Sequence, residues 1–376
     1  MSKQKIKLSL TTICKNEERV IGRSIDSVKD IIDEWVYIDT GSEDKTPDII
    51  KEKVGNIYFT KWDGDYSKAR NYGVNKCTGD WILVMDCDEH MTPKSANLIK
   101  EIIEKTPENI WEILVRVQDY IDDSLIPQYI VYGHRLFRNH KDIKWGGKGH
   151  EALTTPLIYR TQDPRLIILH DKTPNAVSPI QPGRTDLAQV FVNNFLDSIE
   201  KNPKDARSMF YLANTLMGQH HYQEAIKWYH TYLNTSTWTD ERYQARLFCA
   251  RCYTYIGEIK NAREMMLDAY EERIDRNEGD ILLGEMAFNE KKYKQALMWF
   301  HLAEKKAEKA QQGIYPETLL FLEGQAYTYL PYDWLAITYY KLNNYQKAKE
   351  YTIKTLKFIP NNKRLEGNLL FYNGEK

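Results

Sequence analysis

Two aspartates, Asp86 and Asp88, stand two positions apart just after the apolar run at residues 81–84. Such a run is typical of a buried strand, so both carboxylates are expected where that strand meets a loop. Mg²⁺ and Mn²⁺ prefer oxygen ligands and leave positions open for the phosphates of a substrate. The pair therefore predicts a divalent-metal site, although an isolated Asp-x-Asp is more often a feature of a turn or cap.

These aspartates lie in a region that alternates strand-like and helix-like patterns, from about residue 5 to residue 171. Short β-like runs at residues 7–13, 35–38, 56–60 and 81–85 are separated by helical patterns, and β-rich runs follow at residues 111–118, 134–138 and 166–169. Strands that alternate with helices indicate a mostly parallel sheet covered on both faces. Ligands of such sheets bind at the carboxyl ends of strands, which is where Asp39, Asp86 and Asp88 are expected.

After a breaker-rich linker at residues 173–183 the pattern becomes helical and repetitive. A short motif around a small residue recurs at Ala225, Ala262, Ala296 and Ala348, with steps of 37, 34 and 52 residues. A step near 34 is typical of tetratricopeptide repeats, and the longer last step predicts an insertion at about residues 313–325. We expect an α/β domain over residues 1–180 and an all-α, tetratricopeptide-like domain over residues 181–376.

Composition narrows the class of protein. The 376 residues are 42% hydrophobic and 28% charged, as in a globular protein of two domains. We find neither an apolar run near the roughly 18 residues that span a bilayer nor a signal-peptide core, so a cytoplasmic location is expected. Five cysteines are an odd and sparse set in a chain of this size, so no disulfide framework is expected. A net charge of −1 gives no support for strong non-specific binding to nucleic acid, although a local basic groove is compatible with it.

Several segments resemble family 2 glycosyltransferases of the GT-A fold, a nucleotide-sugar-binding fold. The matching blocks, in order, are TICKNEE (12–18), IDTGSEDKT (38–46), WDGDYSKARN (62–71), TGDWILVMDCDE (78–89), FRN (137–139) and WGGKGHE (145–151). The resemblance covers about residues 5–171. It extends to the repeats, because one subgroup, which includes S-glycosyltransferases that modify bacteriocin peptides, carries a C-terminal tetratricopeptide-like region.

For the nucleotide, the resemblance implies contacts from Thr12, Asn16, Glu18, Asp39, Gly41, Asp65, Arg70 and Asp86. A carboxylate at Asp39 can accept hydrogen bonds from a base or ribose, and it can also act as a cap before Thr46-Pro47, ahead of the helix expected through Ile49 and Ile50. Gly41 allows a tight turn. Arg70 lies in a helix expected from about residue 67 with Asp65 as its cap, and it can contact phosphate in bidentate fashion. The alternative for Arg70 is a structural ion pair with Asp65 or Asp86.

For the metal, the resemblance implies Asp86, Asp88 and His170 as ligands of Mn²⁺ or Mg²⁺, which would stabilise charge on the leaving nucleoside diphosphate. A histidine after an apolar strand is more often structural. In addition, Asp171 and Lys172 stand where the family tends to have glycine and an aromatic residue.

For the acceptor, Glu151 is the candidate general base that takes a proton as the sugar transfers with inversion. Its alternative role is to orient His150 or an arginine. Asp119, Asp122 and Asp123 are rivals for the base.

The sequence therefore predicts transfer of a sugar from a nucleotide sugar, with UDP implied by resemblance. Tetratricopeptide stacks form concave surfaces that suit peptide-like partners, so we expect a peptide or protein acceptor, or a homodimer formed through the repeats. One alternative acceptor is a glycan or a lipid-linked envelope precursor. Another is a modified base of phage-type DNA, which predicts a basic stripe beside the site and salt-sensitive binding. A scaffold with an inactive transferase domain is the remaining alternative, and the intact Asp39, Arg70, Asp86 and Asp88 argue against it.

Overall fold

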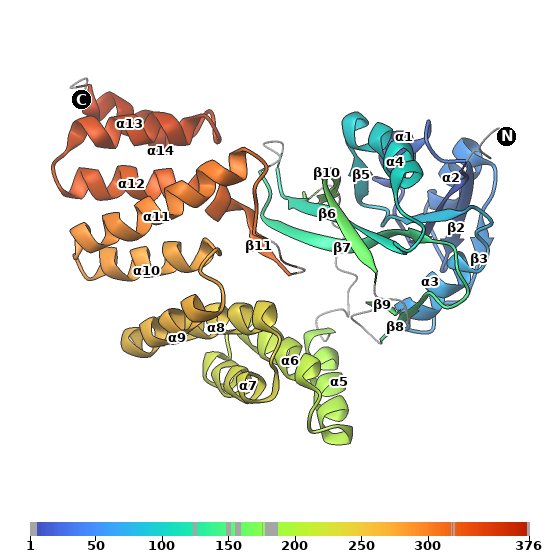
Figure 1. The fold of residues 1–376 in the computed structure, drawn as a ribbon, viewed down its shortest axis with the longest axis horizontal. Coiled ribbons are helices and arrows are strands. Elements are labelled where there is room, and N and C mark those ends of the chain that lie inside the picture. The colour runs from blue at the N-terminus through green and yellow to red at the C-terminus, as the bar shows by residue number, and fades with distance from the viewer. Residues whose placement is uncertain are drawn as a thin grey trace. The chain divides into compact units, whose positions relative to one another are not determined.

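One mixed β-sheet organises the first part of the chain. A computed structural model describes residues 6–122, 126–147, 152–154, 159–174, 176, 187–316, 318 and 320–373, and the chain divides into two units, Met1–Pro179 and Ile180–Lys376. The first unit (Figure 1) contains strands β1 (Leu8–Cys14), β2 (Glu34–Asp39), β3 (Tyr58–Phe59), β4 (Trp81–Val84), β5 (Glu89–Met91), β6 (Glu112–Tyr120), β7 (Tyr129–Arg138), β8 (Lys144–Gly146), β9 (Ala152–Thr154) and β10 (Arg160–Asp171), and helices α1 (Ile21–Val28), α2 (Thr46–Val54), α3 (Tyr66–Val74) and α4 (Pro93–Lys105).

The strands of this sheet lie in the order β3-β2-β1-β4-β7-β6-β10-β5. β1 is parallel to β2 and β4, β2 to β3, and β6 to β10, whereas β7 is antiparallel to β4 and β6, and β5 to β10. Cys14 pairs with Asp39 and Thr11 with Val84, so β1, β2 and β4 end at the same edge. The α/β fold class predicted from the sequence is confirmed, with antiparallel strands added to the parallel ones.

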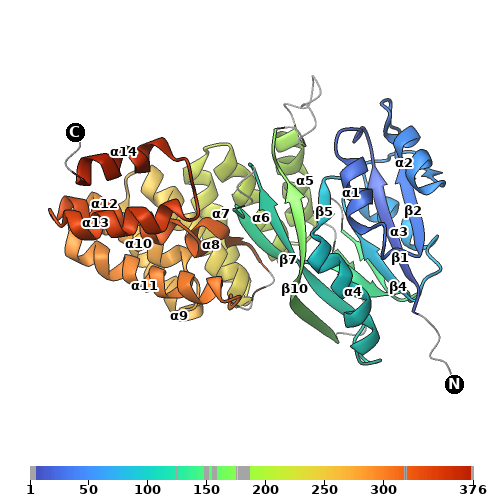
Figure 2. The same cartoon turned by 90° about the horizontal axis from the view of Figure 1, so that it is seen from above.

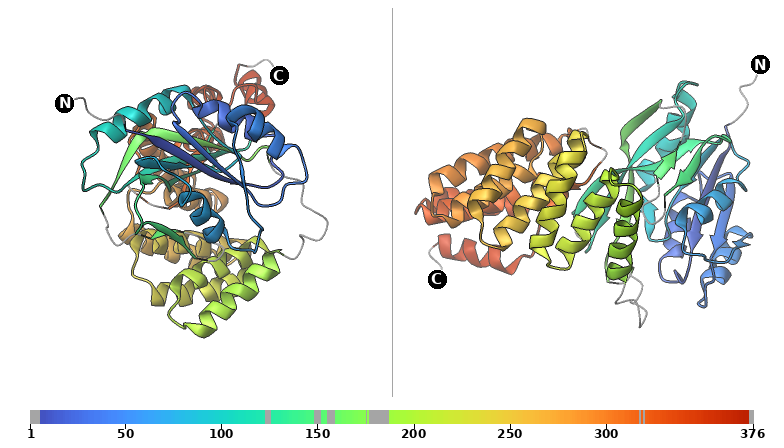
Figure 3. Two further views of the ribbon diagram at one scale, coloured as in Figure 1. Left: turned by 90° about the vertical axis from the view of Figure 1, so that its right-hand side faces the viewer. Right: turned by 90° about the horizontal axis from the view of Figure 1, so that it is seen from below.

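Apolar side chains on both faces of the central strands explain why helices cover both sides of the sheet. Leu10 of β1 and Leu83 of β4 pack in a core with residues of α1, α2 and α4. On the opposite face, Ile82 and Val84 pack with Val74 of α3 and with the hairpin of β8 and β9. The left panel of Figure 3 shows helices on either side of the strands. The sheet is thus a rigid layer from which loops project at the edge where β1, β2 and β4 end.

Apolar spacing and a capping residue explain why the helices nearest to that edge form where they do. In α1, Ile21, Ile25 and Val28 recur at helical spacing and are all buried. Helix α3 begins after Asp65, whose side chain accepts a hydrogen bond from the Lys68 N–H at 3.3 Å. The cap predicted at Asp65 is therefore confirmed.

The second unit is helical. It contains α5 (Leu187–Lys201), α6 (Ala206–Gly218), α7 (Tyr222–Thr235), α8 (Thr239–Tyr255), α9 (Ile259–Glu272), α10 (Glu278–Asn289), α11 (Tyr293–Gln311), α12 (Leu330–Lys341), α13 (Tyr345–Leu356) and α14 (Lys363–Tyr372). Successive helices pack against one another, and α12, α13 and α14 lie beside each other in Figure 2. The predicted linker at residues 173–183 lies largely outside the described residues.

The repeated alanines mark closely packed positions in this unit. Ala225, Ala262, Ala296 and Ala348, from α7, α9, α11 and α13, are all fully buried. A small side chain at each site lets the paired helices approach, which is the packing expected of tetratricopeptide repeats. The predicted insertion is also present, because β11 (Leu322–Glu323) and the 3₁₀ helix η2 (Gly324–Tyr327) lie between α11 and α12. Among the helices in the described ranges, we find none long and apolar enough to cross a membrane.

Candidate active site at the carboxyl ends of the strands

Polar side chains from separate strands meet at the edge where β1, β2 and β4 end. Asp39 is the last residue of β2, and Asp86 and Asp88 follow β4. His170 lies near the end of β10, where it pairs in register with Asp119 of β6. The predicted metal residues Asp88 and His170 are in contact, with 3.1 Å between Asp88 Oδ2 and His170 Nε2.

Two residues that are predicted to bind the nucleotide, Asn16 and Glu18, connect the loop after β1 to the loop after β2. Asn16 adopts a left-handed backbone conformation (φ 58°), and its Oδ1 accepts a hydrogen bond from the Glu43 N–H at 2.8 Å. The Glu18 carboxylate accepts one from the Lys45 N–H at 3.0 Å. Asn16 and Glu18 therefore fix the two loops relative to each other, and their contact with a nucleotide stays a prediction. Thr12 is buried inside β1.

Asp39 shapes a turn. Its Oδ1 accepts hydrogen bonds from the backbone N–H groups of Gly41 at 2.8 Å and Ser42 at 2.9 Å. Gly41 has a φ of +112°, which a residue with a side chain rarely adopts, so the glycine is required for the turn. The alternative in which Asp39 caps the next helix is wrong, because α2 begins at Thr46 and Lys45 occupies the cap position.

Asp86 is held by two arginines. Arg70, buried in α3, donates from Nη2 to Asp86 Oδ1 at 2.9 Å, and Arg135 of β7 donates from Nη2 to Asp86 Oδ2 at 3.0 Å. Burial disfavours ionisation, but the two guanidinium groups outweigh it and hold the pKa of Asp86 well below its usual range. The ion pair between Arg70 and Asp86, kept open as an alternative from the sequence, is present.

A second carboxylate completes this arrangement. Glu89 is fully buried, accepts a hydrogen bond from Arg135 Nη2 at 2.6 Å, and accepts another from the Asp86 N–H at 2.8 Å. Glu89 and Arg135 thus fix both the backbone and the carboxylate of Asp86. Sequence reasoning missed Arg135, because a single arginine in a β-rich run carries no signal of its partner.

Asp88 faces cations. His170 Nε2 lies 3.1 Å and Lys172 Nζ 3.2 Å from Asp88 Oδ2, and His170 Nδ1 lies 2.9 Å from Asp119 Oδ1. Burial opposes the charged imidazole, yet the hydrogen bonds to Asp119 and Asp88 raise the pKa of His170 to about 10. The two carboxylates on either side of the ring therefore favour the imidazolium form of His170.

The fit of this site to a metal is partial. Within the ranges that the structure describes, no group of three or more His, Cys, Asp or Glu side chains is arranged as a metal site. Even so, Asp88 and His170 Nε2 face each other while Asp119 holds the other ring nitrogen, and a carboxylate commonly orients a metal-bound histidine in this way. Asp88 and His170 would be available to a divalent cation only if it displaced the proton between them and Lys172, whereas both oxygens of Asp86 already accept hydrogen bonds from arginines.

Another carboxyl group lies near this pair. Burial, followed by the charges of Asp88 and Asp44, raises the pKa of Glu17 to about 7. Its N–H donates to Thr46 Oγ1 at 2.7 Å, which fixes the loop that carries it. Sequence reasoning selected Glu18 and missed Glu17, since two adjacent glutamates do not reveal which one turns inward.

The predicted general base lies outside the described residues. Glu151, with His150 beside it, falls in a stretch of which nothing is described, and so does its rival Asp123. Asp119 is bound to His170, which makes it a positioning group for that ring. Asp122 is exposed.

The first unit is an α/β domain in which paired carboxylates and cations gather at the ends of parallel strands, the place where ligands of such sheets bind. Comparison with known proteins agrees. Residues 9–162 match the model of Glycosyl transferase family 2, residues 194–227 match a Tetratricopeptide repeat, and residues 279–374 match the Prolyl 4-hydroxylase peptide-substrate-binding domain. The first unit is thus similar to glycosyl transferase family 2 over residues 9–162, and the helical unit is similar to tetratricopeptide-type repeats.

Individual relatives share parts of this organisation. A TPR repeat-containing protein of Synechococcus elongatus is 33% identical over 170 residues, which are 44% of this chain and 40% of that protein. The prophage-derived glycosyltransferase SunS of Bacillus subtilis is 26% identical over 244 residues, 61% of this chain and 54% of that protein. An uncharacterized glycosyltransferase of Rickettsia typhi is 35% identical over 96 residues, 26% of this chain and 32% of that protein. The matches span about half the length of these relatives or less.

Proposed function

We propose that the chain is a glycosyltransferase that moves a sugar from a nucleotide sugar to an acceptor. The observation that carries this proposal is the cluster of Asp86, Asp88, Arg70 and His170 at the strand ends, inside the segment that matches the glycosyl transferase family. Two of the relatives, from Bacillus subtilis and Rickettsia typhi, are named as glycosyltransferases, which adds support.

The donor is proposed to lie along the ends of β1, β2 and β4. The Oδ2 atom of Asp39 is assigned to the base or ribose, because Oδ1 already accepts the two N–H groups of the Gly41 turn. Arg70, Arg135 and Lys172 supply positive charge beside Asp86 and Asp88, where the diphosphate would be bound. UDP is proposed as the nucleotide by resemblance.

A divalent cation, Mn²⁺ or Mg²⁺, would act when bound as a Lewis acid for the charge that builds on the leaving diphosphate. Asp88 and His170 are the residues proposed to hold it. Asp119 would keep the His170 ring in place, and Arg70 and Arg135 would keep Asp86 ionised beside it.

Transfer with inversion needs a base on the acceptor side of the sugar. Glu151 remains the proposed base. Asp119 suits that role less well, since its carboxylate is bound to the protonated ring of His170.

The acceptor is proposed to be a polypeptide. Supporting this choice, the helical unit consists of tetratricopeptide-type repeats and matches a domain described as peptide-substrate-binding. Homodimerisation through these repeats remains a separate prediction. A cytoplasmic location is also proposed, in keeping with five cysteines that are all buried and unpaired.

The experiment that tests the activity is a thermal-shift screen of UDP-, GDP-, dTDP- and CMP-sugars, each with and without Mn²⁺. A ligand that binds only the folded protein raises the Tm by mass action, by an amount equivalent to about 2.7 kcal/mol at a hundred times its Kd. We expect a Mn²⁺-dependent shift with a UDP-sugar. A shift with another nucleotide would correct the donor, and no shift with any donor would favour the scaffold alternative.

A further inference from the structure

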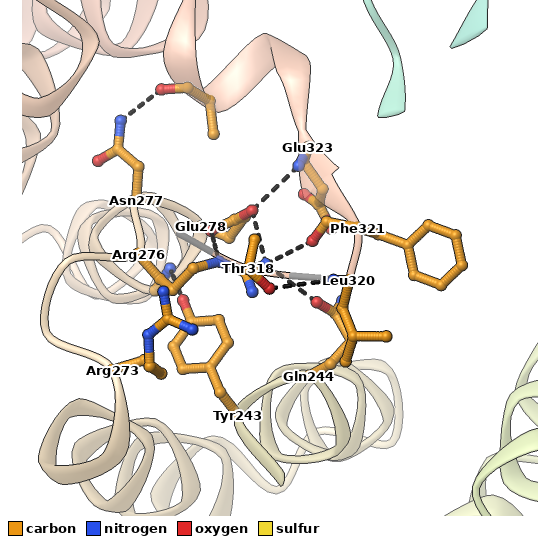
Figure 4. Close-up of polar contacts among 12 residues, drawn as sticks. Tyr243, Gln244, Arg273, Arg276, Asn277, Glu278, Thr318, Leu320, Phe321 and Glu323 are labelled. Atoms are coloured by element: carbon orange, nitrogen blue, oxygen red, sulfur yellow. Dashed lines mark hydrogen bonds and ion pairs between the residues drawn. The ribbon is translucent and has the colours of Figure 1, made fainter. Parts of the chain in front are cut away.

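The insertion between α11 and α12 occupies one part of a helical face. The Glu323 carboxylate accepts hydrogen bonds from both terminal nitrogens of Arg251 in α8, and its N–H donates to Glu278 Oε1 of α10 at 3.0 Å. The Phe321 carbonyl accepts from Arg276 Nη2 at 2.6 Å (Figure 4). This face of α8 and α10 thus binds an extended segment of its own chain.

A buried ion pair supports that contact. Arg276 and Glu278 are both fully buried, with 2.9 Å between Arg276 Nη2 and Glu278 Oε1. Gln244 of α8 accepts from Arg276 at 3.0 Å, and Tyr327 of η2 donates to Glu278 at 3.1 Å. Because the pair binds both the helices and the insertion, the insertion is a fixed part of the face near the start of α10.

Further along the same helices the face is hollow. A cavity of about 200 Å³ lies between the end of α8, the start of α9 and the second half of α10. Ile259, Leu282 and Met286 line its apolar part, and Glu285 and Glu290 its acidic part. This volume is below the roughly 300–1,000 Å³ of a small-molecule site, and it suits one amino-acid side chain.

The two acids of this cavity differ in their partners. Glu290 is bound by two cations, Arg263 at 2.7 Å and Lys292 at 2.8 Å. Glu285 accepts from a neutral indole, Trp334 Nε1, at 3.0 Å. Burial raises the pKa of the Glu285 carboxyl, and Arg251, which is hydrogen-bonded to Glu323, opposes that effect from nearby. Glu285 thus places a carboxyl group beside apolar walls, and a cation that enters the cavity would favour its ionised form.

A ligand group that complements this cavity has an apolar stem and a cationic end. Lysine and arginine side chains have this form. We propose that the cavity at Glu285 is a side-chain pocket that takes a basic residue of an extended polypeptide acceptor. That this polypeptide is the sugar acceptor rests on the proposed function. It also rests on the insertion, which shows that the neighbouring part of this face binds extended chain through side chains of α8 and α10.

The test is a direct binding measurement on the full chain, without donor. Two fluorescein-labelled probes are compared by anisotropy: four repeats of Gly-Ser-Lys and four repeats of Gly-Ser-norleucine, which differ only in the terminal amines. Glu285→Gln removes the charge but keeps an oxygen acceptor for Trp334. Glu264→Gln makes the same change on α9, where the side chain is 64% exposed, and serves as the matched control.

We expect the unaltered protein and Glu264→Gln to bind the lysine probe about tenfold more tightly than the norleucine probe, as for one charged hydrogen bond. Glu285→Gln should lose that preference with an unchanged Tm. Glu285→Asp keeps the charge and should retain part of the preference. This second variant keeps the test valid if Glu285→Gln fails to fold. Equal preference in Glu285→Gln and the unaltered protein, or no preference in the unaltered protein, overturns the pocket. Donor binding is measured separately, so a failed donor screen would refute the transferase proposal while leaving this result decisive for the pocket.

Discussion

At the scale of residues, the site is organised by groups that keep two aspartates ionised and fixed. Asp86 is bound by Arg70 and Arg135, and Glu89 ties Arg135 to the Asp86 backbone. A carboxylate that is oriented before the ligand arrives loses less freedom on binding. Arg135 and Glu89 are therefore positioning residues for Asp86.

The first prediction concerns this pair. Replacing Arg135 alone would leave Glu89 buried without its cation, which typically costs 3–5 kcal/mol, so both are changed together as Arg135→Gln with Glu89→Gln. We expect this double variant to fold and to bind the donor about 10–100 times more weakly, as when outer residues of a metal site are removed. The measurement is calorimetric titration of UDP-sugar with Mn²⁺.

Arg165→Met, which alters an exposed ion pair with Asp163, is the control for that titration and should leave donor affinity unchanged. Donor affinity in the double variant equal to that of the control would show that Asp86 needs no support from this pair.

At the scale of elements, the sequence predicts strands well where both faces are apolar. The run at 81–85 corresponds to β4, and the run at 35–38 lies within β2. Two strands begin earlier than predicted, β7 at Tyr129 and β10 at Arg160. The early part of β10 is polar and is defined by its backbone pairing with β6, which also pairs with the early part of β7, where Ile130 and Tyr132 are buried. β5, β8 and β9 are too short to carry a periodic pattern.

The candidate site was predictable to the extent that its residues follow strands. Asp39, Asp86, Asp88 and His170 each come at or after a strand end, so topology alone brings them to the same edge. Arg135 was not predictable, because its role depends on β7 lying beside β4, an antiparallel pairing that the alternating pattern of strands and helices does not encode.

The second prediction concerns Glu34 at the start of β2. Burial opposes its ionisation, but hydrogen bonds from Ser9, Thr78 and the Thr78 N–H, with Lys7 nearby, lower its pKa from 4.5 to about 2. A lowered pKa gives stability that is complete above the unfolded-state pKa near 4.5 and is lost as the pH falls toward 2. We expect the stability difference between the unaltered protein and Glu34→Gln to shrink over that window.

Urea unfolding of both proteins at pH 6 and at pH 3.5 measures this difference. Other acids titrate in the same range, but they do so in both proteins, so the comparison isolates Glu34. A difference that stays constant between the two pH values would mean that Glu34 ionises in the folded protein as it does in the unfolded chain.

At the scale of the whole molecule, each unit has its own core and its own candidate site. The core around Leu10 and Leu83 supports the strand-end cluster, whereas the core around Phe210, Tyr229 and Met266 belongs to the repeats. Every residue that forms the Asp88 cluster lies in the first unit, and every residue that lines the Glu285 cavity lies in the second. Changes in one site are thus expected to leave the local structure of the other intact.

The third prediction follows from this division. Asp88→Ala removes the carboxylate that faces both His170 and Lys172, and with it the proposed metal ligand. Donor-dependent stabilisation by Mn²⁺ should be abolished, while the preference for the lysine probe and the helical circular dichroism signal should stay as they are. Asp26→Ala, which breaks a surface ion pair with Lys53, is the control and should change neither measurement. A Mn²⁺-dependent Tm shift that persists in Asp88→Ala would remove Asp88 from the metal site, and loss of the helical signal would show that the two units do not fold independently.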